Sequence, residues 1–225
     1  MVKMQRAVAI FTCELLAMLA ATGAARAAPE LYEYRIVHAT HGEIGRYANI
    51  IEQRGAETVV RTELHIAVTI LGLTAYRQDA ERVERWHGER LTSFDGTTLT
   101  NGDRLEVHGQ AQGGGFAITT LAGTVMAPAD VHPSNPWSAM VLKTDTVMST
   151  RTGKLFHGVI AGGERKAMRL GDKPMSLRQY EITTDKHEFV WLDDQGTPVA
   201  FRTKEDGDDI DFILERRETL VAKSE

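Results

Sequence analysis

The stretch that most constrains the fold is ETVVRTELHIAVTI, Glu57–Ile70, in which apolar and polar residues alternate. One side carries the apolar residues Val60, Leu64, Ile66, Val68 and Ile70, and the other carries Arg61, Glu63, His65 and Thr69. A period of two over this length is typical of a β-strand with one buried and one solvated face. The segment LYEYRIV from Leu31 alternates in the same way. Both segments therefore predict strands that pack one face on a core.

Glycine-containing turn signals recur along the chain at intervals of roughly ten residues, which is typical of an all-β meander. Asn101-Gly102 suits a two-residue hairpin loop, because both residues tolerate positive φ. Near the C-terminus, FVWLDDQGTPVAFRTKEDGDDIDFIL predicts three strands joined by two turns. The chain shows neither heptads nor internal repeats nor an interior linker. These patterns predict a single antiparallel β domain over residues 28–225.

One short helix interrupts the predicted strands, in PSNPWSAMVLKTDTVMS from Pro133. Asn135 is placed to cap this helix and Pro136 to begin it, because proline needs no amide hydrogen at the first helical position. Apolar residues follow at helical spacing. We therefore predict a helix of about two turns, from about Pro136 to Lys143.

The N-terminal segment predicts export. Residues 1–27 begin with Lys3 and Arg6, continue through an apolar run and end in Ala25-Arg26-Ala27, which is the pattern of a cleaved secretory signal peptide. The run is shorter than the ~20 apolar residues of a membrane span, so we expect no stable membrane insertion after cleavage. The one cysteine, Cys13, would be removed with this segment. We predict a periplasmic or secreted protein without disulfides.

The charge balance argues against nucleic acid as a partner. The whole chain has 26 basic and 31 acidic residues, and removal of residues 1–27 takes away three basic residues and one acidic residue. The remaining chain carries a net charge of about −7, whereas nucleic acids and anionic membranes favour a basic surface.

Catalytic motifs are weak in this sequence. His132 with Ser134, and Ser149 with His157, are the candidate nucleophile pairs, but neither lies on the G-x-S-x-G elbow that such a serine usually needs. A turn or capping role is the better interpretation of Ser134. We therefore predict no catalytic residues, and a non-enzymatic protein is the favoured interpretation.

Metal and phosphate sites are also poorly supported. His38 and His41, with Glu43 nearby, have the closest spacing of potential metal ligands, but a stable zinc site needs three or four converging ligands. The acidic run 205–209 lacks the spacing of a calcium loop and is predicted to be a hairpin tip. The run Gly113–Gly115 is followed by neither lysine nor a helix start, so it predicts a turn. We predict neither a metal nor a cofactor.

Three tryptophans are the candidate ligand-binding residues: Trp86, Trp137 and Trp191. The ordinary interpretation is that each fills a core, because each belongs to an apolar periodic segment. Trp137 is the strongest candidate for ligand contact, because the first turn of the predicted helix would place it across the inner face of a curved sheet.

Several segments together resemble a bacterial family of exported proteins that is known only as a domain of unknown function. The segments are LYEYRIV, Ile44-Gly45 as a turn, ERWHGERL, TLTNGD, PSNPW and WLDDQGTPVAF. The resemblance covers nearly the whole chain after the signal peptide. The meander with one mid-chain helix is also similar to the periplasmic lipoprotein-carrier (LolA/LolB-like) fold. This second resemblance implies one strongly curved antiparallel sheet or an incomplete β-barrel.

A curved sheet partly covered by a helix can hold an acyl chain or another hydrophobic ligand. We therefore expect a periplasmic binding or carrier protein whose partner is a hydrophobic small molecule. An envelope scaffold that binds another protein is the alternative, and a hydrolase or metal-dependent enzyme is the weaker one. A hollow interior would favour the carrier, whereas a filled barrel with an exposed apolar patch or a bare edge strand would favour the scaffold.

Overall fold

The computed structural model describes residues 27–170, 173–205 and 207–221. The predicted signal peptide therefore lies, except for its last residue, outside the described residues. Within the described part, thirteen strands form one antiparallel sheet, and three short strands form a second one. The strands of the large sheet are β1 Glu30–His38, β2 Gly42–Arg54, β3 Glu57–Ile70, β4 Leu73–His87, β5 Arg90–Thr100, β6 Asp103–Gln112, β7 Gly115–Thr120, β8 Gly123–Pro128, β12 Val159–Leu170, β13 Lys173–Thr183, β14 His187–Leu192, β15 Pro198–Glu205 and β16 Asp208–Thr219.

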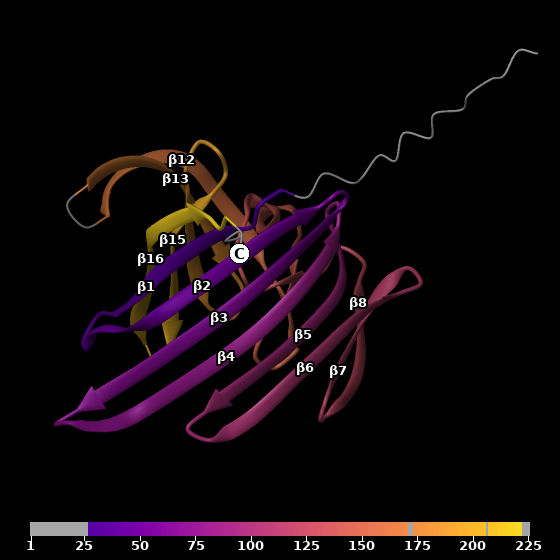
Figure 1. The fold of residues 1–225 in the computed structure, drawn as a ribbon, viewed down its shortest axis with the longest axis horizontal. Helices are drawn as coiled ribbons and strands as arrows, with labels where there is room; N and C mark the ends of the chain where they lie inside the picture. The colour runs from indigo at the N-terminus through magenta and orange to yellow at the C-terminus, as the bar shows by residue number, and fades with distance from the viewer. Residues whose placement is uncertain (1–26, 171–172, 206, 222–225) are drawn as a thin grey trace, which may run out of the picture.

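The large sheet consists of two meanders that join where the first and last strands of the chain pair, in the middle of the sheet. Its order is β12-β13-β14-β15-β16-β1-β2-β3-β4-β5-β6-β7-β8, so the last strand of the chain pairs with the first. Figure 1 shows β1 to β8 as a tilted, twisted wall, with β12 and β13 curling away at the far side of β16. Strands β8 and β12 are the two edges of this sheet, so the described residues form an incomplete barrel. The prediction of a mainly β, strongly curved antiparallel sheet is confirmed.

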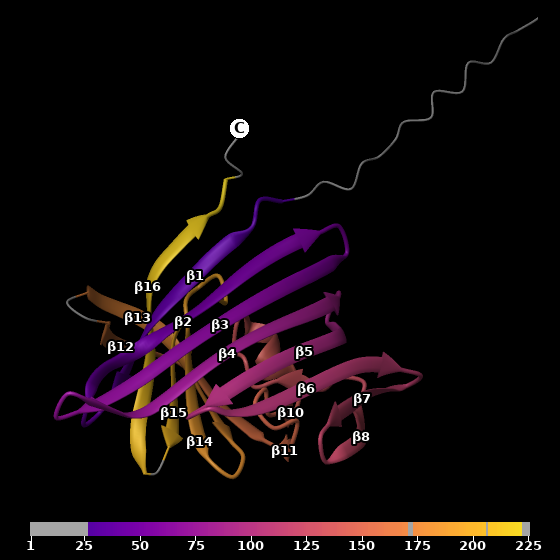
Figure 2. The same cartoon turned by 60° about the horizontal axis from the view of Figure 1, so that its bottom comes forward.

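Residues 131–157, which we call the plug, leave this sheet and fill part of its concave side. The plug contains β9 His132–Pro133, a 3₁₀ helix η1 Ala139–Lys143, β10 Thr146–Met148 and β11 Leu155–His157. Val131 and Met148 pack in one core cluster with side chains of β3 to β8, and Val141 packs in another with β13 and β14. In Figure 2, β10 and β11 lie behind the β4 to β6 wall. The plug thus bridges the two halves of the open barrel.

The predicted mid-chain helix is wrong in type and in bounds. The structure has a 3₁₀ helix of five residues, Ala139–Lys143, whose cap is Ser138 rather than Asn135. The Ser138 hydroxyl accepts a hydrogen bond from the amide of Met140, at 3.2 Å. Asn135 does not cap because its side chain is buried and bonded to three strands of the large sheet. Tertiary hydrogen bonds therefore override the local capping signal at this position.

The strand predictions are confirmed by the burial pattern. Tyr32, Tyr34 and Ile36 of β1 are buried, as are Leu64 and Ile66 of β3. The C-terminal segment forms β14, β15 and β16, joined by turns as predicted. Asn101 and Gly102 both have positive φ, at 51° and 96°, between β5 and β6. Local alternation and turn chemistry therefore determine most of the strand boundaries.

Ile44-Gly45 is not the turn that the resemblance implied, because both residues lie inside β2. Gly45 pairs with Ile66 of β3, and a Cβ at Gly45 would lie 2.0 Å from the carbonyl oxygen of His65. Only glycine allows the two strands to come this close at the inner wall of the barrel.

We expect Gly45→Ala to lower the free energy of unfolding by about 1–3 kcal/mol, because the added methyl must push β3 away from β2. Urea unfolding monitored by tryptophan fluorescence measures this change. Gly114→Ala is the matched control, because a Cβ at Gly114 meets nothing within 4 Å. An equal loss of stability in the two variants would show that the close approach of β2 and β3 at Gly45 is not responsible, because the entropy effect of Gly→Ala is stabilising.

The part of the chain that the structure describes contains no helix with the length and hydrophobicity of a membrane span.

Candidate functional site

A cavity of about 760 Å³ lies between the plug and the concave face of the large sheet. Its walls come from β1 to β4, from β14 to β16 and from the plug. The cavity is partly open at the end of the barrel where the β1–β2, β3–β4, β13–β14 and β15–β16 turns lie, and side chains from all four turn regions line it. We call this end the mouth.

Apolar side chains form the main wall of the cavity. They alternate along each strand and stand next to one another across the sheet, because the strand registers align them: Val68 lies opposite Tyr76, and Phe201 opposite Phe212. The rings of Phe201 and Phe212 are stacked at 4.2 Å. The apolar and aromatic lining residues are Ile44, Tyr47, Leu64, Ile66, Val68, Ile70, Ala75, Tyr76, Val141, Val147, Phe156, Phe189, Val190, Phe201, Ile210 and Phe212. A wall of this kind suits a hydrophobic ligand.

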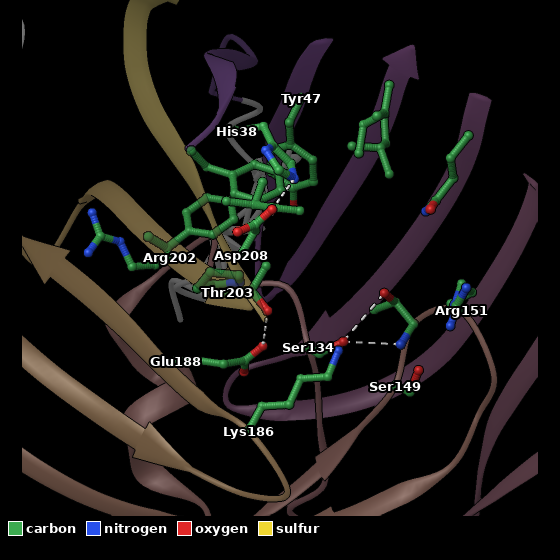
Figure 3. Close-up of a pocket in the computed structure, with 18 of the residues that line it drawn as sticks. His38, Tyr47, Ser134, Ser149, Arg151, Lys186, Glu188, Arg202, Thr203 and Asp208 are labelled. Atoms are coloured by element: carbon green, nitrogen blue, oxygen red, sulfur yellow. Dashed lines mark hydrogen bonds and ion pairs between the residues drawn. The ribbon is translucent and has the colours of Figure 1, made fainter. Parts of the chain in front are cut away.

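Polar and charged residues gather at the mouth, where Figure 3 shows several of them. His38 of β1 lies 3.7 Å from the carboxylate of Asp208, which begins β16. Thr203 donates a hydrogen bond to Glu188 across β15 and β14, at 3.0 Å. Lys186 from the β13–β14 turn also lines this opening. The entrance is therefore mixed in charge, whereas apolar side chains predominate further in, beside a few polar residues such as Gln78, Ser134 and Thr150.

One buried charge interrupts the apolar interior. Arg82 of β4 lines the cavity and is only 7 % exposed. Its Nε is buried and has no hydrogen-bond partner among the described residues. Arg82 is paired with Gly96 of β5. The aliphatic part of the Arg82 side chain lies over this glycine, since a Cβ added to Gly96 would be 3.5 Å from Cγ of Arg82. Burial lowers the pKa of the guanidinium, but arginine stays protonated in proteins at neutral pH.

Two residues further along the same face of β4, Glu84 ties the plug to the sheet. Its Oε2 accepts hydrogen bonds from the indole nitrogens of Trp86 and Trp137, each at 3.0 Å. Its Oε1 accepts one from Nδ2 of Asn135 at 2.8 Å. The same amide nitrogen donates to Thr62, and the Asn135 carbonyl oxygen accepts a hydrogen bond from Tyr47. Asn135 therefore anchors the plug through side chains of β2, β3 and β4.

Burial shifts the pKa of two groups around this anchor in opposite directions. Desolvation raises the pKa of the fully buried Glu84 carboxyl to about 7, although the hydrogen bonds from Asn135 and the two tryptophans favour the charged form. Desolvation also lowers the pKa of His132 in the plug to about 4. The His132 ring packs on Trp86 at 4.7 Å between ring centres. At neutral pH, His132 is therefore neutral and Glu84 is partly protonated.

The structure brings two of the three predicted ligand-binding tryptophans together, but none of the three is among the residues that line the cavity. Trp86 and Trp137 meet edge to face at 5.9 Å and share Glu84 as acceptor. Trp191 lies in a separate cluster with Leu177, Val199 and Ala200. Ligand binding by these tryptophans stays a prediction, whereas their packing and hydrogen bonds give Trp86 and Trp137 a structural role.

The serine and histidine pairs named from the sequence have other partners. The Ser134 hydroxyl accepts a hydrogen bond from the amide of Thr150 at 3.1 Å, and the Ser149 hydroxyl accepts one from the amide of Thr152 at 3.2 Å. His157 Nδ1 lies 3.4 Å from the Thr146 hydroxyl. Both serines therefore organise turns of the plug.

His38 and His41 do come close, with ring centres 4.8 Å apart. The His38 Nδ1 accepts a hydrogen bond from the amide of Thr40 at 3.1 Å, and Glu43 pairs instead with Arg46. Within the described residues, no group of three His, Cys, Asp or Glu side chains is placed to hold a metal ion.

Arg82 and Glu84 are the site residues that reasoning from the sequence missed. Both share the parity of Trp86 along β4, so the two charges and the tryptophan must face the same side of the sheet. The sequence could have indicated this, because the two charged residues alternate with the same period as a tryptophan that is expected to be buried. The polarity of the flanking residues, Glu81 and Arg85, concealed it.

The comparisons with known proteins agree with this architecture. A solved structure, a β-barrel-like protein of the domain of unknown function DUF1849 from Brucella abortus, superimposes with a TM-score of 0.65. The alignment covers 87 % of this chain and 99 % of that chain at 9 % sequence identity, so the likeness concerns the fold alone. A comparison with curated proteins gave no match. The family model of DUF6134, a domain of unknown function, matches residues 34–215. The chain therefore belongs to the DUF6134 family.

Proposed function

We propose that this protein is a non-enzymatic carrier or binding protein for a hydrophobic ligand, and that it acts in the periplasm or outside the cell. The observation that carries the proposal is the cavity of about 760 Å³ with its aliphatic and aromatic wall. Ligand pockets typically have volumes of about 300–1,000 Å³ and are lined mainly by such side chains. The signal-peptide pattern of residues 1–27 supports the location.

The plug supports the same proposal, because it makes the open barrel into a container. A single curved sheet has an exposed concave face, whereas here Val141, Val147 and Phe156 of the plug supply the opposite wall of the cavity. The anchor at Glu84 and Asn135 holds this wall in place. Both carboxylate oxygens of the buried Glu84 accept hydrogen bonds. These hydrogen bonds fix the plug, and with it this wall of the cavity, to the sheet.

Native mass spectrometry of protein purified gently from the periplasm tests the proposal. We expect a bound species that adds the mass of a small amphiphile and that is released by organic extraction. Purified protein is also expected to take up a neutral fluorescent hydrophobic probe with saturable, one-site binding. Absence of both a copurified small molecule and saturable probe uptake would contradict the carrier function.

A cavity-filling substitution should block uptake. Val68 of β3 lines the cavity and is partly buried, so Val68→Trp is expected to weaken probe binding at least about tenfold, which is about 1.4 kcal/mol. Thr69→Trp is the control, because Thr69 is the next residue of the same strand and is exposed outside the cavity wall. Fluorescence titration of both variants measures the difference. Equal binding by the two variants would place the probe elsewhere on the protein.

An envelope scaffold that binds another protein is the second candidate. The observation in its favour is the tip of the β3–β4 hairpin, where Leu71 is 98 % exposed and Leu73 is 75 % exposed. Contiguous exposed apolar residues of this kind are typical of interaction sites. Because Ile70 at the same tip also lines the cavity mouth, this contact would place a partner beside the opening.

A further inference from the structure

We propose that the ligand is an amphiphile with one aliphatic chain and one anionic head group, and that Arg82 binds this head group inside the cavity. The inference rests on the proposed carrier function and adds the chemical class of the ligand. The shared chemistry of the head group is a carboxylate or a phosphate, both of which accept the forked hydrogen bonds of a guanidinium.

Arg82 is placed where a ligand would reach it. Tyr76, Gln78 and Arg82 are successive cavity-lining positions on the inner face of β4, and Arg82 is the one furthest from the mouth. Six positions separate Tyr76 from Arg82, which corresponds to roughly 20 Å along the strand. Across this length the neighbouring positions of β3 contribute Leu64, Ile66 and Val68. An extended aliphatic chain therefore fits between the mouth and the buried cation.

Within the described part of the chain, Arg82 interacts electrostatically with Tyr47 and Glu84 but has no direct hydrogen-bonded partner for its charge. Among the described residues, no hydrogen bond satisfies its Nε, and no carboxylate forms an ion pair with it within 4.0 Å. Burial of a charge without a partner is strongly unfavourable, so such a group is expected to have a partner in the functional state. Of the charged residues that line the described cavity, Arg82 is the buried one, whereas those at the mouth are exposed or half-buried.

Glu84, two residues further along the same face of β4, is an alternative partner for Arg82, and its hydrogen bonds argue against that role. Both Glu84 oxygens already accept hydrogen bonds, from Asn135 on one side and from the two tryptophans on the other. Burial raises the pKa of Glu84 even though the charge of Arg82 acts to lower it. Glu84 is therefore committed to the plug, and Arg82 remains available to the cavity.

Competition binding against a neutral fluorescent probe tests the inference with three ligands of equal chain length. These are dodecanoate, dodecyl phosphate and dodecan-1-ol, each used below its aggregation concentration. We expect the wild-type protein to bind at least one of the two anions about tenfold or more tightly than the alcohol, because charge-assisted hydrogen bonds are stronger than neutral ones. The two anionic arms distinguish a carboxylate ligand from a phosphate ligand.

Arg82→Met keeps the length of the apolar stem and removes the charge. We expect this variant to lose the preference for anions, to bind dodecan-1-ol within about threefold of the wild type, and to unfold at the same or a higher temperature, because an uncompensated buried charge is gone. Arg82→Lys keeps the charge and should retain a reduced preference. Arg61→Met is the matched control, because Arg61 of β3 is an exposed cation that does not line the cavity. It should leave the preference unchanged.

The outcomes separate the inference from the function on which it rests. If the wild-type protein binds none of the three ligands and no probe, the carrier function fails. If it binds the alcohol as tightly as the anions, or if Arg82→Met keeps the preference, only the inference fails. An Arg82→Met protein that does not fold would show that Arg82 is a structural charge, which also overturns the inference.

Discussion

Replacing Trp86 with alanine is expected to lower the free energy of unfolding by about 4 kcal/mol, the usual range for a fully buried aromatic residue. Trp86 is 1 % exposed and packs in the cluster that joins the plug to β3 to β8. Its ring meets Trp137 edge to face and packs on His132. The substitution therefore removes packing and also one of the three hydrogen bonds to Glu84. Urea unfolding at neutral pH measures the loss.

Trp86→Phe separates the two contributions. Phenylalanine keeps most of the apolar contact but cannot donate to Oε2 of Glu84, so we expect a smaller loss of about 1–3 kcal/mol. Trp137→Phe removes the other donor to the same oxygen from a half-buried position and provides the comparison. If Trp86→Phe were as stable as the wild type, the hydrogen bond from Trp86 to Glu84 would contribute nothing to the stability of the fold.

Replacing Glu84 with glutamine is expected to change how stability depends on pH. The pKa of Glu84 rises from its ordinary value of 4.5 to about 7 on folding, so the folded state binds more protons than the unfolded state between these values. The free energy of unfolding that Glu84 contributes is therefore fully present below pH 4.5 and is lost as the pH rises through 7. A shift of this size corresponds to roughly 3 kcal/mol.

His132 acts in the opposite direction over nearly the same range. Its folded pKa is lowered from 6.5 to about 4, so its contribution is present above pH 6.5 and is lost as the pH falls through 4. In the wild-type protein the two contributions offset each other. Without the Glu84 carboxyl, the His132 contribution is left, and the Glu84→Gln variant should lose stability on acidification.

Urea unfolding of the wild type and Glu84→Gln at several pH values between 4.5 and 8 measures this difference. We expect the difference in free energy of unfolding between Glu84→Gln and the wild type to shift by roughly 3 kcal/mol in favour of the variant as the pH rises across this range. Glu81→Gln is the matched control, because Glu81 is an exposed carboxylate on the outer face of the same strand. A difference between wild type and Glu84→Gln that stays constant with pH would show that Glu84 does not titrate in this range.

The fold was largely predictable because its signals are local. Alternation in Glu57–Ile70 and the Asn101-Gly102 turn depend on residues that are neighbours in the chain, and both are confirmed. The prediction that the PSNPW segment starts a helix was wrong because a distant contact decides its conformation. The capping signal of Asn135 is local, but its partner Glu84 is 51 residues away, and the buried hydrogen bond between them is more favourable than a cap at the surface.

The candidate site was much less predictable. The tryptophans drew attention because of their size, yet the apolar wall of the cavity consists mainly of ordinary aliphatic and phenylalanine residues from six strands and the plug. Arg82 is unremarkable in ERVERWH, where charged residues surround it. Its significance comes from being buried, from lining the cavity and from having no hydrogen-bond partner at Nε in the described part of the chain.

The sequence by itself determined the strands, most of the turns and the antiparallel meander, because these follow from side-chain periodicity and from glycine at positions of positive φ. Only the tertiary structure decided that the barrel is hollow, that the plug forms one wall of the cavity and that Arg82 lines this space with an Nε that bonds to none of the described residues. The physical reason is that the energy of a buried charge or hydrogen bond depends on which distant segments meet around it. Periodicity assigns a face to each residue, but it does not say what that face will contact.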